Sequence, residues 1–451
     1  MSLLRTGCRY LSSGKSSASV AAAVKSEQTH SPPKYETNKS VSGIHYCNLD
    51  NPKPIVNLMV MVNGAGSSSE TYKNEGVSHA LRLSCGLSTK NFTRFGTIRN
   101  VQQLGTALEC IQTRENLIYS MKIHRDYFLD GLDFLRENVV CPSLKKWEIE
   151  DSIASAMKLE IEQMNPLIKA QEELLRVSYR RGLGNSLFCP ERNIGAISND
   201  MIRDFHSTHF NMENVIFGAN GIDQMTARRL ADTFHLPSGK AESSIPSKFH
   251  VGESRIDTRD SNVHIAFGSG TQLELKNPGD HTAVIANYLL SIILGKGISV
   301  KRGQGIGKLT QGLRSALGDV PFGVSSLYNE FEHTTVIGAN IITEASSAGK
   351  AIDAALKTIK ELKISEKDLQ GAKKRAEIDF NVCIEEQADN LLGALSLFHL
   401  TGNPNMEGWI DLIHTISVSD VQAAADRMAK SKFSMSSVGN LVNVPYLDSL
   451  Q

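Results

Sequence analysis

The chain has 451 residues, more than one hydrophobic core normally serves, so the sequence predicts two domains of roughly 200 residues each. Lysine plus arginine number 48, as do aspartate plus glutamate, and this neutral balance argues against a nucleic-acid-binding protein. The seven cysteines are scattered and contain no C-x-x-C pair, which predicts reduced thiols rather than a disulfide framework, a zinc ribbon or an attached haem.

Residues 1–37 are predicted to be a mitochondrial presequence followed by a flexible arm. The first acidic residue is Glu27, and the segment before it is rich in serine, alanine and basic residues, as is typical of mitochondrial targeting. Arg9, Leu11 and Ser12 resemble a matrix-processing site, with arginine three residues before the cut and serine after it. An ordinary disordered tail is the alternative interpretation.

Positions 79–83 have the spacing of the inverted zinc motif H-x-x-E-H. In that motif two histidines on one helix face bind zinc, and the glutamate activates a metal-bound water. Here only His79 remains, because Arg82 takes the glutamate position and Leu83 the position of the second histidine. A guanidinium stays protonated and cannot act as a base, and a catalytic zinc ion usually has three protein ligands. The sequence therefore predicts a peptidase scaffold without peptidase chemistry.

The third ligand of such a site is a glutamate on a later helix, and 76 intervening residues after Leu83 lead to Glu160. Glu160 continues an apolar stripe of a helix predicted over 147–163. One interpretation is a residual metal site made of His79 and Glu160. The other, which we favour, is a relic in which Glu160 is hydrogen-bonded or paired, with Arg82 as the candidate partner, and no metal is bound.

Two further motifs suggest ligand binding and are better explained otherwise. His206 and His209 are three residues apart at the end of a predicted helix, where a cationic side chain is common. The glycine-rich segment 295–309 lacks the glycine and hydroxyl residue that the Walker phosphate loop would need at positions 302 and 309. No nucleophilic elbow is present, so we expect neither catalytic residues nor a cofactor.

The apolar stretch 283–294 precedes the glycine-rich segment. It is far shorter than the ~20 residues that cross a bilayer. We therefore expect any membrane contact to be peripheral and to pass through partner proteins.

Three elements recur in the same order, which predicts a duplicated plan. Each half contains a β-rich run that leads through glycines into a helix, an amphipathic helix, and a capped helix followed by a strand. The β-rich runs are offset by 204 positions and the capped helices by 220. The paired segments are 54–64 with 261–270, 128–139 with 352–362, and 199–218 with 419–438.

The pattern predicts an α+β fold of two domains, each a mostly antiparallel sheet with helices on one face, together forming a clamshell. The first domain is expected over 38–235 and the second over 253–451. The proline- and serine-rich segment 236–252 is the predicted linker.

Several segments together resemble the pitrilysin and mitochondrial processing peptidase family. The similarity extends over about 38–451. It is carried by 74–79 before the motif, 113–116, 179–195, 209–221, 300–303 and the C-terminal 439–448.

With arginine at the base position, the sequence resembles the non-catalytic core subunits of the cytochrome bc1 complex, which is ubiquinol–cytochrome c reductase. The resemblance implies a peripheral, matrix-facing scaffold on the mitochondrial inner membrane that pairs with a related core subunit, core protein 1. It would also support the cytochrome b, cytochrome c1 and Rieske subunits, which hold the redox cofactors. The alternative within the family is the substrate-binding α-subunit of the processing peptidase. That subunit has a long glycine-rich loop, which segment 295–307 of this chain matches poorly. An active zinc peptidase is a third interpretation, against which Arg82 and Leu83 argue.

Overall fold

The computed structural model describes residues 34–240, 246–296, 305–405 and 407–450. The predicted processing site at Arg9, Leu11 and Ser12 lies outside these ranges, as does 297–304 of the glycine-rich segment. Within the described ranges, no helix is long and apolar enough to cross a membrane.

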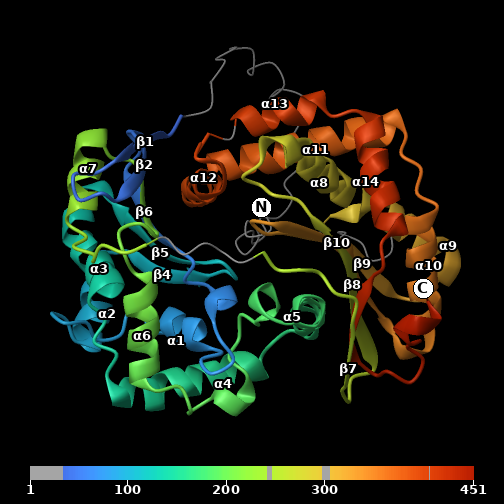
Figure 1. Ribbon diagram of the computed structural model, residues 1–451, viewed down its shortest axis with the longest axis horizontal. Coiled ribbons are helices and arrows are strands. Elements are labelled where there is room, and N and C mark those ends of the chain that lie inside the picture. Colours follow the sequence, from blue (N-terminus) through green and yellow to red (C-terminus); the bar gives the residue numbers. More distant parts are fainter. Residues whose placement is uncertain (1–33, 241–245, 297–304, 406, 451) are drawn as a thin grey trace, which may run out of the picture.

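The described residues form two β-sheets of the same topology, one in each half of the chain (Figure 1). The first has the strand order β1-β2-β6-β3-β5-β4 and the second β7-β11-β8-β10-β9. Neighbouring strands are antiparallel except in β2–β6 and β7–β11. Without β1 the two orders correspond strand for strand, so the predicted α+β class with two mostly antiparallel sheets is confirmed. The strands are β1 (Glu36–Lys39), β2 (His45–Leu49), β3 (Ile55–Asn63), β4 (Ala107–Gln112), β5 (Asn116–His124), β6 (Val215–Asn220), β7 (Glu253–Asp257), β8 (Asn262–Gln272), β9 (Phe322–Glu330), β10 (Thr334–Glu344) and β11 (Ser434–Gly439).

The strand pairing corrects the alignment of the two halves. Val62 of β3 lies opposite Val215 of β6, and Phe267 of β8 lies opposite Met435 of β11. All four side chains belong to the main core of their own half. Equivalent residues of β3 and β8 are therefore 205 positions apart, and the offset of 204 is one residue short. A slip of one would pair Val62 with Ala266, whose side chain lies on the opposite face of its sheet.

The helices of each half cover one face of its own sheet, and their starts are encoded locally. Ser198 accepts a hydrogen bond from the Met201 N–H, and Ser417 forms a capping box with Asp420. The first core includes α1 (Val77–Leu83), α3 (Phe128–Val140), α6 (Asn199–His209) and α7 (Gln224–Asp232), with α2 (Arg94–Gln103) and α4 (Ala154–Glu162) beside it. The second includes α8 (His281–Gly295), α9 (Lys308–Leu317), α10 (Ala348–Lys360), α11 (Glu366–Glu385), α13 (Glu407–Thr415) and α14 (Val418–Lys430).

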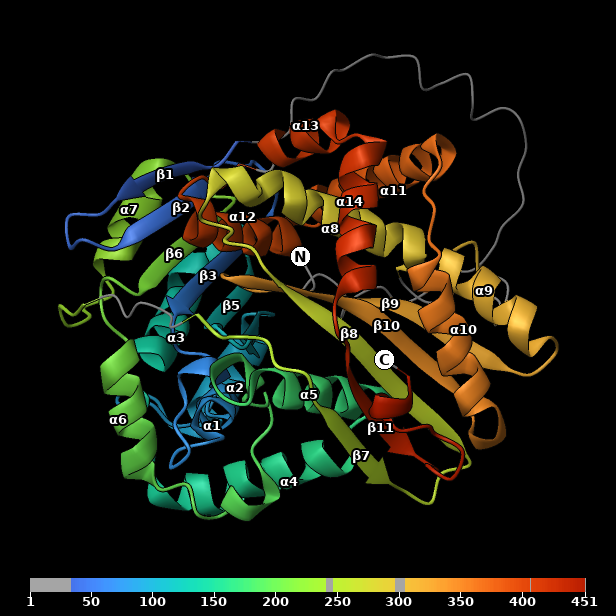
Figure 2. The same ribbon diagram turned by 45° about the vertical axis from the view of Figure 1, so that its right-hand side comes forward.

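The remaining face of each sheet is covered by a helix from the other half (Figure 2). α5 (Pro166–Tyr179) packs on β8 and β11, and α12 (Gln387–Thr401) packs on β3 and β6. The near-continuous apolar run of β3 fits a strand that is buried on both faces. At Gly218 of β6, an added Cβ would lie 2.8 Å from a methyl carbon of Leu395, so glycine allows α12 to approach closely. This reciprocal exchange locks the two halves together.

Candidate functional site at the relic zinc motif

The helix that carries the motif residues is held at its start by Glu70. This buried carboxylate accepts hydrogen bonds from the Gly76 and Ser78 N–H groups, at 2.8 and 2.7 Å. Gly76 has a φ of 95°, and an added Cβ would lie 2.5 Å from the Cys189 sulfur. Burial raises the pKa of Glu70 to about 7. Sequence reasoning missed Glu70, because its spacing to the helix matches no common capping motif.

Glu75 precedes the helix and takes no part in its first turn. Its carboxylate forms an ion pair with Arg192, and its carbonyl accepts a hydrogen bond from the Asn193 side-chain amide at 2.9 Å. Glu75 therefore lies outside the first turn of α1, which begins two residues later.

His79 is buried and held at both ring nitrogens. Its side chain is only 1% exposed, and its Nδ1 accepts a hydrogen bond from the Cys189 N–H at 3.0 Å. The ring proton must then be on Nε2, which donates to a Glu160 carboxylate oxygen at 2.8 Å. The ring also meets Phe188 edge-on, with centroids 5.7 Å apart. Burial lowers the pKa of His79, so the imidazole is neutral at physiological pH.

One carboxylate oxygen of Glu160 accepts hydrogen bonds from both His79 and Arg82. The oxygen that accepts from His79 also accepts from the Arg82 guanidinium. The hydrogen bond from His79, and then the nearby positive charge of Arg82, hold the pKa of Glu160 below its usual range. The structure thus brings together His79, Arg82 and Glu160, whereas Leu83 is a partly buried side chain packed against the core.

This arrangement does not fit a zinc ion. Nδ1 of His79 already accepts a hydrogen bond, Nε2 carries a proton directed at Glu160, and the carboxylate already has a cationic partner in Arg82. Within the described ranges, no group of three or more histidine, cysteine, aspartate or glutamate side chains is placed to hold a metal. The chemistry that these three side chains support is a neutral-imidazole, carboxylate and guanidinium network that fixes α1 to α4.

A buried ion pair that sequence reasoning missed holds the segment that contacts His79. Arg114, in the turn between β4 and β5, donates through two nitrogens to Glu172 of α5, at 3.1 and 2.9 Å. Glu172 also accepts from the Leu187 N–H at 3.0 Å, just before Phe188 and Cys189. The pair therefore connects the first sheet, α5 and the segment that contacts His79. Its only sequence signal is a charged residue on the buried face of α5.

The histidine pair of α6 is structural. His206 is stacked on Phe210 with ring centroids 4.1 Å apart, and its Nε2 donates to the Val139 carbonyl at 2.8 Å. Burial lowers the pKa of His206, so it is a neutral packing group rather than the helix-end cation that we expected. His209 is buried beside Phe205, with ring centroids 4.3 Å apart.

The fold and the motif define a metallopeptidase-like scaffold, and residues 47–191 match the insulinase family, peptidase family M16. Among solved structures, the chain resembles the peptidase M16 inactive domain from Pseudomonas fluorescens. The TM-score is 0.76 at 17% identity over 90% of this chain and 98% of that one, which shows the shared fold.

Similar curated proteins extend the match over both halves. The chain is 27% identical to the mitochondrial cytochrome b-c1 complex subunit 2 of Rattus norvegicus, over 93% of each protein. It is 24% identical to the subunit of that name in Schizosaccharomyces pombe, over 92% of this chain and 95% of the relative. A probable mitochondrial-processing peptidase subunit alpha-1 of Arabidopsis thaliana is 22% identical over 93% of this chain and 84% of that protein. These matches confirm the resemblance predicted from the sequence.

Proposed function

We propose that the chain is a non-catalytic core subunit, the counterpart of core protein 2, of ubiquinol–cytochrome c reductase. In this role it is needed for assembly and stability of the complex and takes no part in electron transfer. The similarity to subunit 2 relatives extends across more than nine-tenths of both chains, so it includes the second half as well as the motif region.

The observation that carries the non-catalytic part of the proposal is the position of Arg82. Its guanidinium stands where the general base of the family would stand, and it is paired with Glu160. A permanent cation cannot remove a proton from water. Together with Leu83, which cannot bind metal, it leaves the scaffold without a hydrolytic centre.

The proposed partners are core protein 1 and the cytochrome b, cytochrome c1 and Rieske subunits. We place the chain on the matrix side of the inner membrane, attached through these subunits. A presequence is removed first, by cleavage between Leu11 and Ser12. The chain exposes large apolar side chains at Tyr72, Phe95 and Trp147, which are 74%, 74% and 61% accessible.

The second candidate is the substrate-binding α-subunit of the processing peptidase, supported by the Arabidopsis relative. Its glycine loop would correspond to 295–307, which Lys296, Lys301, Arg302 and Gln304 interrupt. Native gel electrophoresis of digitonin-solubilised mitochondria separates the two proposals. We expect the chain to migrate with cytochrome b and core protein 1. Migration with a soluble peptidase β-subunit instead would refute the core-subunit proposal in favour of the second.

A further inference from the structure

The second half contains a cavity of about 210 Å³ that the proposed function does not use. It lies at the ends of α10 and α14, remote in sequence from the relic motif in the first half. Its walls are apolar and include Phe267 of β8, Leu356 of α10, Met435 of β11 and Leu447 near the C-terminus.

Comparison of the two halves explains why the cavity exists. Ser198 and Ser417 cap equivalent helices, so the offset of these helices is 219 and the expected 220 is one residue too long. Counting from the caps, His206 corresponds to Ala425 and Phe210 to Ala429. In the first half, the two rings stack on each other, and Phe210 is only 1% exposed. In the second half, both rings are replaced by methyl groups, and Ala429 lines the cavity. The space is thus associated with the loss of two aromatic side chains between otherwise equivalent elements.

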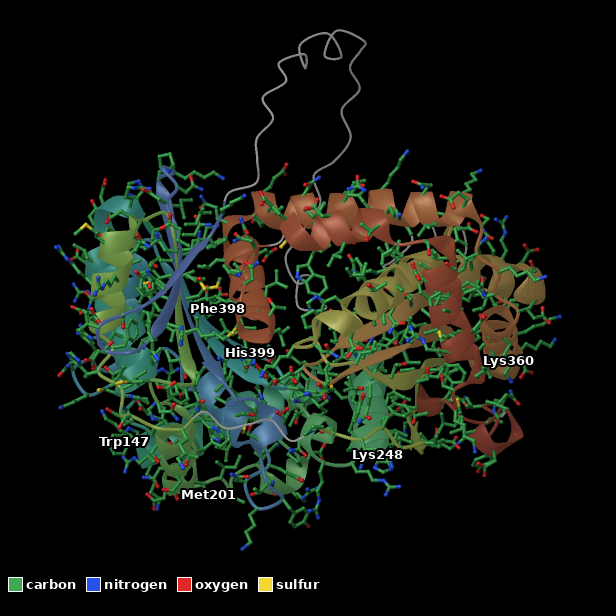
Figure 3. All side chains as sticks on the ribbon, turned by 45° about the horizontal axis from the view of Figure 1, so that its top comes forward. Trp147, Met201, Lys248, Lys360, Phe398 and His399 are labelled. Carbon is green, nitrogen blue, oxygen red and sulfur yellow. The ribbon has the colours of Figure 1, made fainter. Side chains whose placement is uncertain are left out.

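The cavity is bordered by cations and by no acidic side chain. Lys360, Lys430 and Lys432 all contribute to its lining, and within the described ranges none of them has an ion-pair partner. Figure 3 labels Lys360 at the outer edge of the second half. Lys360 and Lys430 lie in the last turns of α10 and α14, where a cation also stabilises the helix dipole. Lys432 lies beyond α14 and has no helix end to serve.

We propose that this cavity binds a medium-chain acyl carboxylate, with the acyl chain between α10 and α14 and the carboxylate among the three lysines. A six-carbon ring fits an apolar cavity of about 150 Å³, so in proportion this one admits roughly eight carbons. That size excludes the paired long chains of a phospholipid. Binding of a peptide by strand addition would need a free strand edge, and both β8 and β11 are interior strands.

The test is calorimetric titration of the purified full-length chain with octanoate, beside octan-1-ol as the uncharged analogue. We expect one site per chain, with octan-1-ol binding at least tenfold more weakly. The substitution Ala429→Phe restores the ring that the first half has and should weaken octanoate binding at least tenfold. Replacing Lys360, Lys430 and Lys432 with glutamine should weaken octanoate at least tenfold and leave octan-1-ol binding unchanged.

Circular dichroism and thermal unfolding verify that each variant is folded, and Ala429→Leu serves if the larger ring is not tolerated. A matched control is Ala423→Phe, since Ala423 is an exposed residue of the same helix and is not part of the cavity lining. No octanoate binding at millimolar concentration would overturn the proposal. Octanoate binding that survives both the ring and the lysine substitutions would also overturn it. The same holds if the chain binds anionic vesicles or acidic peptides in place of octanoate and Ala429→Phe abolishes that binding.

Discussion

Replacing Arg114 with methionine should destabilise the protein strongly, because it leaves a carboxylate buried without its cation. Arg114 and Glu172 are only 6% and 9% exposed, and they form a two-fold hydrogen-bonded pair. Removing one partner of such a pair costs about 3–5 kcal/mol. The double variant Arg114→Met with Glu172→Gln removes both charges, while glutamine can still accept from the Leu187 N–H. Its cost should fall to about 1–3 kcal/mol, the range for lost hydrogen bonds.

Urea unfolding followed by circular dichroism measures these differences as shifts of the midpoint. Midpoints can be compared between variants even where a chain of this size does not unfold in two states. Arg94→Met is the matched control, since Arg94 is exposed and its guanidinium donates to the Ser152 hydroxyl at 2.8 Å. That control should change stability by no more than about 0.5 kcal/mol. A double variant as unstable as Arg114→Met, or more so, would refute the argument that charge burial dominates.

Other perturbations test the remaining parts of the structure. Burial raises the pKa of Glu115 to about 7, so the folded protein binds a proton that the unfolded chain releases near pH 4.5, and stability should fall as the pH rises from 4.5 to 7. Glu115→Gln should reduce that slope in urea midpoints, with the part that comes from Glu70 left in place, and an unchanged slope would contradict the argument. His79→Ala should leave reductase activity and assembly nearly intact, whereas Val60→Asp, which places a charge at a fully buried position, should abolish assembly on native gels. Elemental analysis should find no stoichiometric zinc in the purified chain; one zinc per chain, lost on His79→Ala, would refute the relic interpretation. N-terminal sequencing of the mitochondrial protein should begin near Ser12, and recovery of Met1 would exclude cleavage.

Local spacing explains which features could be predicted from the sequence. The lost motif occupies five consecutive positions, so Arg82 and Leu83 identify themselves without any knowledge of the fold. Helix caps such as Ser417 are equally local, because a capping box is complete within four residues. A residue count was enough to place Glu160 at the motif, since the family spacing fixes its position, whereas its hydrogen bond with His79 was not predicted.

Features that depend on packing between the halves could not be predicted in this way. The exchange of α5 and α12 is encoded only indirectly, in the second apolar face that Met59 and Met61 give to β3. Such a face indicates that something covers it but does not identify the helix that does. The one-residue error in the offset has a similar origin. The offset of 204 aligns Gly64 with Gly268, whereas the register of the strands is set by which side chains are buried.

The contacts of His79, Arg82 and Glu160 show how a fold of this kind is held together at this place without a metal. Glu160 lies beside a buried neutral imidazole, and a carboxylate there needs a positive partner that a zinc ion would supply in an active peptidase. Arg82 supplies that charge from the glutamate position of H-x-x-E-H, so under the relic interpretation one side chain accounts both for the absent base and for the pairing of Glu160. Arg82→Met should therefore raise the pKa of Glu160, whereas Arg82→Lys should keep it low. The change that ended the chemistry is, on this view, also the one that stabilises the remaining site.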